Sequence, residues 1–266
     1  MKWNCGISFV LFAFTVTGLG AQDTFQLAPP YLRYESVFFT KEARVTIEFA
    51  QPGTRIHYNI NNLGPTEKDS IYTAPIIIKK NTDLLSARVF GEGFLPSETV
   101  WARFYKQGFQ IKSVTTPPPH EQYPGNGKQT LIDGKGGINS YQSNNWMGFQ
   151  TNETTLFLTL QKAQKVTQVL VHLLQNQDAW IFLPSKIEVY GAKQGTKDWT
   201  FLGAQELINT TVKAQSASCQ AIFANIAKPI KVKEIMLKIT PLLSIPDWHP
   251  GKGNPAWIFL DEIIVY

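Results

Sequence analysis

The sequence predicts an all-β protein made of two β-sandwiches, and three observations support this prediction. Hydrophobic and polar residues alternate with period 2 in many short segments, turn-forming residues separate those segments, and none of them shows a convincing period of 3.6. The 266 residues are 43% hydrophobic and 17% charged. This composition excludes a disordered chain, and the length suffices for one large core or two ordinary cores.

The charge of the chain gives no sign of a nucleic-acid partner. The formal net charge is +5, and the Lys and Arg residues are scattered along the sequence. A protein that follows a phosphate backbone needs its basic residues clustered in a patch or stripe. We therefore expect no binding to nucleic acid.

The N-terminus has the pattern of a secretory signal peptide over residues 1–21. Lys2 gives the positive charge, residues 7–16 form an apolar run, and residues 18–21 supply small residues for cleavage. The run is shorter than the about 20 residues that span a bilayer, and no other run suggests a membrane span. We expect export to the periplasm, the cell surface or the medium. Cys219 is then the only cysteine, so no internal disulfide can form.

The first predicted sandwich occupies residues 22–107. Its β-like segments are residues 45–49, 56–60, 76–78, 84–90 and 100–105. Clusters of Gly, Pro and Asn separate these segments at the short intervals that are typical of an all-β sandwich. Pro117, Pro118 and Pro119 cannot continue a hydrogen-bonded strand, so they form a stiff extended segment. We place the domain boundary near Gly108.

The second predicted sandwich occupies residues 108–266. Its expected strands are residues 156–160, 166–174, 186–190, 199–202, 232–239 and 257–265. The loops between them are longer than in the first unit and hold many of the Trp, Asn, Asp and His residues. This pattern favours a jelly-roll sandwich whose loops can form a site at one end.

The first unit carries a recognisable set of residues. The set is Ile56, Tyr58, Pro65, Thr66, Ser70, Tyr72, Pro75, Ile76, Ala87 and Arg88. On these residues the unit resembles the chitobiase/β-hexosaminidase C-terminal domain, an immunoglobulin-like sandwich attached to bacterial glycosidases. Asn61 and Asn62 stand where that family has Asp-Gly, and Asn tolerates the left-handed backbone of such a turn. The resemblance implies no activity.

The second unit carries a longer set of matching residues. They are Leu131-Ile132-Asp133-Gly134, Trp146-x-Gly148-Phe149, residues 155–160, residues 180–184, residues 186–190 and residues 248–263. On these residues the unit resembles the discoidin, or coagulation factor V/VIII type C, domain, whose carbohydrate-binding relatives often follow hexosaminidase or fucosidase catalytic domains. Residues 191–195 depart from the Ser-x-Asp-Gly turn of many relatives. The resemblance implies a discoidin-type jelly roll after the immunoglobulin-like sandwich.

Three loops of the second unit combine aromatic side chains with amide, carboxylate or imidazole groups, which is the mixture that binds sugars. They are residues 141–146, 175–180 and 245–249. The resemblance implies that these loops converge at one end of the sandwich. The candidate sugar-binding residues are Trp146, Asn176, Asp178, Trp248 and His249.

Each candidate also has an ordinary structural interpretation. Trp146 is equally suited to the core, His249 could cap a turn, and Asn176 and Asp178 could be solvated loop residues. Trp180 and Trp257 each begin a Trp-Ile-Phe-Leu run that enters a strand. For these two indoles core packing is the favoured interpretation.

The resemblance further implies a structural calcium ion held by Asp133 and Glu262. The loop at residues 135–137 offers backbone carbonyls, and calcium prefers carboxylate and carbonyl oxygens. The alternative is that Asp133 closes an Asx-turn and that Glu262 is a solvated strand residue.

The acidic residues do not predict catalysis. Glycoside hydrolysis needs two carboxyls that face one bond. Asp261 and Glu262 are neighbours in an expected strand, so we expect their side chains on opposite faces. Asp178 and Asp247 lie in separate loops. The (β/α)₈ barrel of the related glycosidases takes about 250 residues. A chain that already forms two sandwiches has no room for it.

The sequence therefore predicts an exported, non-catalytic protein that binds a terminal sugar of a glycan through loops of its C-terminal domain. One alternative is an accessory chain of a glycoside hydrolase that acts with a separate catalytic chain of the hexosaminidase or fucosidase type. A second alternative is a surface adhesion protein that recognises protein or lipid.

Overall fold

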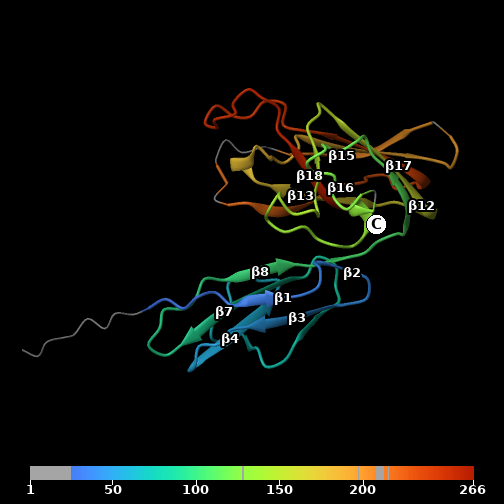
Figure 1. The fold of residues 1–266 in the computed structure, drawn as a ribbon. Helices are drawn as coiled ribbons and strands as arrows, with labels where there is room; N and C mark the ends of the chain where they lie inside the picture. Colours follow the sequence, from blue (N-terminus) through green and yellow to red (C-terminus); the bar gives the residue numbers. More distant parts are fainter. Residues whose placement is uncertain (1–24, 128, 197, 208–212, 215) are drawn as a thin grey trace, which may run out of the picture.

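The computed structural model describes residues 25–127, 129–196, 198–207, 213–214 and 216–266. The predicted signal peptide, residues 1–21, lies outside these described residues. The chain forms two β-sandwiches, one above the other in Figure 1, with two short 3-10 helices, η1 (Thr130–Ile132) and η2 (Gln177–Ala179). The predicted all-β class is confirmed. No helix within the described ranges is long and apolar enough to cross a membrane.

The first sandwich is built from nine strands. They are β1 (Tyr31–Arg33), β2 (Phe38–Phe39), β3 (Ala43–Glu48), β4 (Thr54–Ile60), β5 (Ser70–Ile71), β6 (Ile76–Ile78), β7 (Leu84–Gly91), β8 (Val100–Arg103) and β9 (Tyr105–Lys106). Their sheets have the orders β1-β3-β6, β5-β4-β7-β8 and β2-β9. The alternation of Val45 and Ile47 with polar neighbours directs these side chains to one face of β3, where they share a core with Phe104.

The second sandwich is built from two larger sheets. Its strands are β10 (Ile111–Thr115), β11 (Met147–Phe149), β12 (Thr154–Lys165), β13 (Gln168–Gln175), β14 (Lys186–Ala192), β15 (Thr200–Glu206), β16 (Ser218–Asn225), β17 (Lys231–Thr240) and β18 (Ile258–Val265). The five-stranded sheet has the order β10-β12-β17-β14-β15, and the four-stranded sheet has the order β11-β18-β13-β16. Leucine, isoleucine and valine side chains from both sheets fill the space between them.

The chain passes from the first sandwich to the second at Gly108. A Cβ atom at Gly108 would meet the backbone carbonyl of Val265, so only glycine allows this approach. Phe109 then donates its N–H to the same carbonyl at 2.7 Å, and β10 pairs with β12. The prolines 117–119 follow the end of β10. In the second sandwich the expected strands lacked β10, β11 and β16, and in the first they lacked β1, β2 and β5; these strands are short or weakly apolar.

The two sandwiches share an apolar contact. Phe38 and Tyr105 of the first sandwich pack with Leu170 and Ile264 on the outer face of the four-stranded sheet. The Tyr266 hydroxyl donates to the Lys106 carbonyl at 2.8 Å across the same junction. Because the first sandwich covers this sheet, the outer face of the five-stranded sheet points the opposite way.

Candidate functional site

An aromatic pocket lies at the loop end of the second sandwich. Its volume is about 160 Å³, and it is lined by Tyr123, Tyr141, Ala179, Trp180, Ile181, Trp257 and Phe259. The lining side chains come from the segment after β10, the loop before β11, the η2 turn and the start of β18. Segments that are far apart in the sequence therefore meet at one end of the sandwich.

Neighbouring aromatic rings of this pocket contact one another edge to face. Tyr123 meets Trp257 edge to face with ring centroids 5.6 Å apart, and it meets Tyr141 at 6.1 Å. His120 is exposed and meets Trp257 edge to face at 5.0 Å. These contacts fix the orientation of half-buried rings before any ligand arrives, which lowers the entropy lost on binding.

The backbone around Trp180 holds the two indoles together. Trp180 has φ +64°, a left-handed conformation that is unusual for a tryptophan. Asn176 and Ile181 exchange backbone hydrogen bonds of 2.9 and 3.0 Å around this turn, and Trp257 donates its N–H to the Trp180 carbonyl at 2.9 Å. Gly251 lies so close to the Trp180 ring that a side chain there would collide with it. The surrounding contacts thus maintain a strained turn that positions Trp180.

The structure reverses two expectations about indoles. Trp180 and Trp257, for which core packing was favoured, are half-buried and line the pocket. Trp146, expected as a sugar platform, is 1% exposed. Its ring stacks on His172 and its Nε1 donates to the Ile138 carbonyl at 3.0 Å. The interpretation of Trp146 as a sugar platform is therefore wrong, because its faces are used inside the core.

His249 is also buried, at 5% exposure, and joins two loops. Its Nδ1 accepts the Gly251 N–H at 3.0 Å, so its Nε2 carries the proton and donates to the Gln177 carbonyl at 2.8 Å. The expected contact of this imidazole with sugar is wrong, since both nitrogens are used by the backbone. The alternative role in a turn fits instead.

Trp248 packs against Phe182 with ring centroids 6.3 Å apart, and the residue is half-buried. Its Nε1 is buried and has no hydrogen-bond partner within the described residues. Asp178 is exposed and pairs with Lys213 at 2.8 Å, and this hydrogen bond lowers the pKa of the Asp178 carboxyl. Asn176 is half-buried beside the strained turn. Sugar contact by Trp248, Asn176 and Asp178 stays a prediction.

The adjacent acids Asp261 and Glu262 do not face opposite sides as expected. The pairing of β13 with β18 shifts register here. His172 is paired with Glu262, whereas the next residue, Leu173, is paired with Leu260. This bulge leaves Asp261 as an extra residue and turns both carboxyls toward the loop after η1. Glu262 accepts the Gly134 N–H at 2.9 Å, and Asp261 accepts the Gly137 N–H. Asp261 also pairs with His172 Nδ1 at 2.6 Å.

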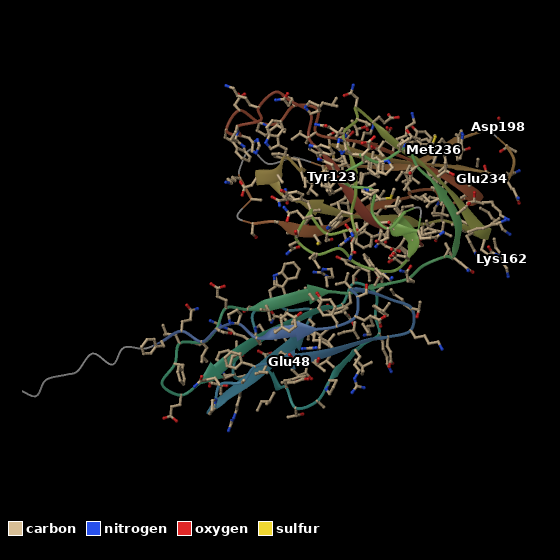
Figure 2. The ribbon with its side chains drawn as sticks, in the orientation of Figure 1. Glu48, Tyr123, Lys162, Asp198, Glu234 and Met236 are labelled. Carbon is tan, nitrogen blue, oxygen red and sulfur yellow. The ribbon has the colours of Figure 1, made fainter. Side chains whose placement is uncertain are left out.

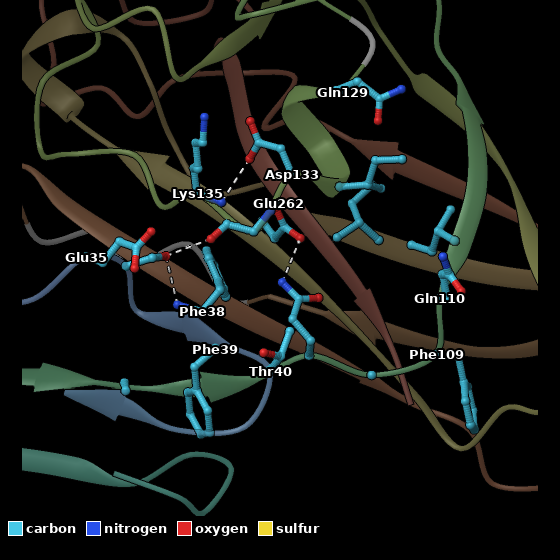
Figure 3. A pocket seen from close by; sticks show the side chains of 18 of the residues that line it. Glu35, Phe38, Phe39, Thr40, Phe109, Gln110, Gln129, Asp133, Lys135 and Glu262 are labelled. Atoms are coloured by element: carbon cyan, nitrogen blue, oxygen red, sulfur yellow. Dashed lines mark hydrogen bonds between the residues drawn. The ribbon is translucent and has the colours of Figure 1, made fainter. Parts of the chain in front are cut away.

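Asp133 and Glu262, the expected calcium ligands, do lie together at the junction of the sandwiches (Figure 3). Both line a cavity of about 1020 Å³ that also includes residues of the first sandwich. Burial is the main cause that raises the pKa of both carboxyls, and it raises that of Glu262 to about 8. The alternative interpretation of Glu262 as a solvated residue is wrong, since it is 1% exposed.

The groups around Glu262 do not form an oxygen cage. N–H donors of Gly134 and Gln107 occupy its two carboxylate oxygens at 2.9 and 3.3 Å. The Gly134 carbonyl accepts the Ser36 hydroxyl at 2.8 Å. Nor does any group of three or more His, Cys, Asp or Glu side chains suit a metal ion in the part of the chain that the structure describes. Calcium needs six to eight oxygen ligands, so the arrangement around Glu262 does not fit the implied ion.

The residues that sequence reasoning missed are Tyr123 and His120. Both lie in the proline-rich stretch after β10, whose composition indicated a spacer and whose aromatic residues received no role. The available signal was the occurrence of these aromatic residues beside the Pro-Gly turn at residues 124–125. Fold and site together define a protein of two β-sandwiches with a preformed aromatic pocket at the loop end of the second.

Comparisons with known proteins find one partial family match and remote structural likenesses. The model of the Fn3 associated family matches residues 45–118, from β3 to the prolines after β10. A search of the curated proteins finds no match. Among solved structures, the C-terminal domain of a chitobiase from Bacteroides fragilis is 18% identical, with a TM-score of 0.35, over 59% of this chain and 92% of that domain.

Two further solved structures are similar at the same remote level. A family 32 carbohydrate-binding module from C. perfringens in complex with galactose is 15% identical, with a TM-score of 0.36, over 57% of this chain and 91% of its own. A SusE-like protein is 12% identical, with a TM-score of 0.39, over 88% of this chain and 95% of its own. These likenesses are too remote to carry an argument about function.

Proposed function

We propose that this protein is an exported, non-catalytic carbohydrate-binding protein whose second sandwich holds one terminal sugar ring of a glycan. The single observation that carries this proposal is the aromatic pocket, in which Tyr123, Tyr141, Trp180 and Trp257 line one depression of about 160 Å³. Pockets for drug-sized ligands measure about 300–1,000 Å³, so this depression suits a single small ring. Export rests on the sequence of residues 1–21.

The chemistry of the lining matches a sugar. An aromatic face carries partial negative charge, and it attracts the polarised C–H groups on one face of a pyranose. The two tyrosine hydroxyls can donate hydrogen bonds to the hydroxyl groups at the edge of the sugar ring, or accept hydrogen bonds from them. The mutual edge-to-face contacts keep the lining in place. We infer weak, selective binding to a sugar such as galactose or an N-acetylhexosamine.

The same lining supports binding without hydrolysis. The described residues that line the pocket supply no carboxyl, imidazole or thiol group. Asp261 and Glu262 are buried farther along β18 and do not line this pocket, and N–H groups occupy their oxygens. Two free carboxyls on either side of one bond, which glycoside hydrolysis needs, are absent from this set.

Calorimetric titration with methyl galactoside and with N-acetylglucosamine tests the proposal. The variants are Trp257→Ala and Tyr141→Ala, and the matched control is Trp101→Ala, a 56% exposed tryptophan of the first sandwich. We expect the wild type and the control to bind one of the sugars with equal affinity. Each pocket variant should weaken binding about tenfold or more, which corresponds to about 1.4 kcal/mol.

Thermal melting of each variant separates a lost contact from a lost fold. Binding that survives in both pocket variants with unchanged affinity refutes the proposal. Hydrolysis of a nitrophenyl glycoside by the purified wild type refutes its non-catalytic part. The accessory-chain alternative predicts that a glycosidase catalytic chain retains this protein in place of sugar binding. The adhesion alternative predicts that a lipid or protein surface retains it instead.

A further inference from the structure

The outer face of the five-stranded sheet carries an aromatic row that the aromatic pocket does not use. Cross-strand partners follow one another in register from β12 to β15: Phe157 faces Met236, Met236 faces Tyr190, and Tyr190 faces Phe201. Directly opposed residues of an antiparallel pair point to the same face of a sheet. Their chain neighbours, such as Leu156 and Leu237, fill the core, so the row points outward.

The row is partly exposed and internally braced. Phe157 is 43% exposed and Phe201 is 55% exposed. Tyr190 and Phe201 meet with ring centroids 5.4 Å apart. Trp199, just before β15, meets Phe157 on β12 at 5.8 Å, so its indole reaches across the strands between them. Met236, labelled in Figure 2, is left only 9% exposed.

Polar rows flank the aromatic row on both sides. On one side Thr155 faces Lys238, and Lys238 faces Glu188. On the other side Thr159 faces Glu234. The Lys238 ammonium lies 6.0 Å from the Tyr190 ring centre and 3.7 Å from a carboxylate oxygen of Glu153. The flanks therefore offer hydroxyl groups and charges of both signs.

We propose that this row is a second binding site, for a neutral polysaccharide chain that lies across the strands. Strands lie about 4.8 Å apart, so the row from β12 to β15 extends about 14 Å, which is longer than one sugar ring. The aromatic rings match the apolar faces of successive sugars, and the polar rows match the hydroxyl groups at both edges. Flanking charges of both signs do not match a polyanion.

The dimensions distinguish this ligand from a protein partner. An aromatic side chain has about 150–250 Å² to bury, so the exposed parts of Phe157 and Phe201 present on the order of 200 Å². A stable protein interface buries about 800 Å² on each partner around an apolar centre. A row one residue wide, with charges on both sides, is too narrow for such a centre and fits a linear chain.

Native affinity electrophoresis of the full chain tests this site. The gels contain hydroxyethylcellulose, glucomannan or homogalacturonan. The double variant Phe157→Ala/Phe201→Ala is compared with Tyr31→Ala, whose side chain is 64% exposed on the first sandwich. We expect a neutral polymer to retard the wild type and Tyr31→Ala equally. The double variant should bind about tenfold more weakly, with an unchanged melting temperature.

Three outcomes overturn the proposal. They are no retardation of the wild type in either neutral polymer, equal retardation of the double variant, and retardation by homogalacturonan alone. Sedimentation velocity supplies a further check, since self-association that the double variant loses would assign the face to a second copy of the chain. The aromatic pocket is tested with single sugars, and this row is tested with linear polymers that have few chain ends, so the failure of one site is distinguishable from the failure of the other.

Discussion

The buried carboxyl of Glu262 makes the stability of the second sandwich depend on pH. Burial raises the pKa of Glu262 from its ordinary value of 4.5 to about 8, against the opposing effect of the N–H donors of Gly134 and Gln107. The carboxyls of Asp261 and Asp133 lie near and raise it further. An acid whose pKa is higher in the folded protein stabilises the fold when protonated. This contribution is complete below pH 4.5 and is lost as the pH rises through 8.

The perturbation is Glu262→Gln, which removes the ionisation and keeps the shape. An amide at position 262 can accept the Gly134 N–H and donate to the side-chain oxygen of Gln107 after that amide turns over. The shift from 4.5 to about 8 corresponds to at most about 5 kcal/mol of stability lost between pH 4.5 and 9. The variant should lack this loss.

Urea unfolding at pH 5, 6, 7, 8 and 9, followed by tryptophan fluorescence, measures the effect. The second sandwich holds five of the seven tryptophans, so the signal reports mainly on that unit. We expect the free energy of unfolding of the wild type to fall toward pH 9 and that of Glu262→Gln to stay nearly level. A wild-type value that is constant over this range, or an equal fall in the variant, refutes the reasoning.

Two further predictions concern the same loop. Gly137→Ala should lower the free energy of unfolding by about 1–3 kcal/mol, because the new Cβ collides with the Trp146 ring. The control Gly64→Ala, whose new Cβ has nothing within 4 Å, should change it by less than about 0.5 kcal/mol. Urea unfolding measures both variants, and equal effects contradict the packing argument. From the N–H donors on Glu262 we expect the melting temperature to be the same in 1 mM calcium and in chelator, and a rise in calcium that Asp133→Ala abolishes would instead support the calcium site.

Local sequence patterns gave most of the sheet structure. The period-2 alternation of segments 45–49 and 56–60 predicts strands that the structure contains as β3 and β4. The pattern works because a half-buried strand must alternate whatever it pairs with. It fails for β11 and β16, since a short or evenly half-buried strand shows no contrast between its two faces.

The sites were harder to predict than the strands. The composition of the loops drew attention to the end of the second sandwich where the aromatic pocket lies, but it misjudged which indoles are buried. A Trp in a polar loop (Trp146) and a Trp before an apolar run (Trp180) differ in exposure through contacts made by distant residues such as His172 and Gly251. Those contacts join segments tens of residues apart, which no local pattern encodes.

The sequence by itself determined the all-β class, the two units and the region of the chain that carries aromatic loops. Only the tertiary structure decided which rings face solvent, because burial depends on the neighbours that the fold supplies. It also decided that Asp261 and Glu262 share one side of their strand, since a bulge is a property of two paired strands. The tertiary structure likewise decided the strand register that aligns Phe157 with Phe201 across four strands.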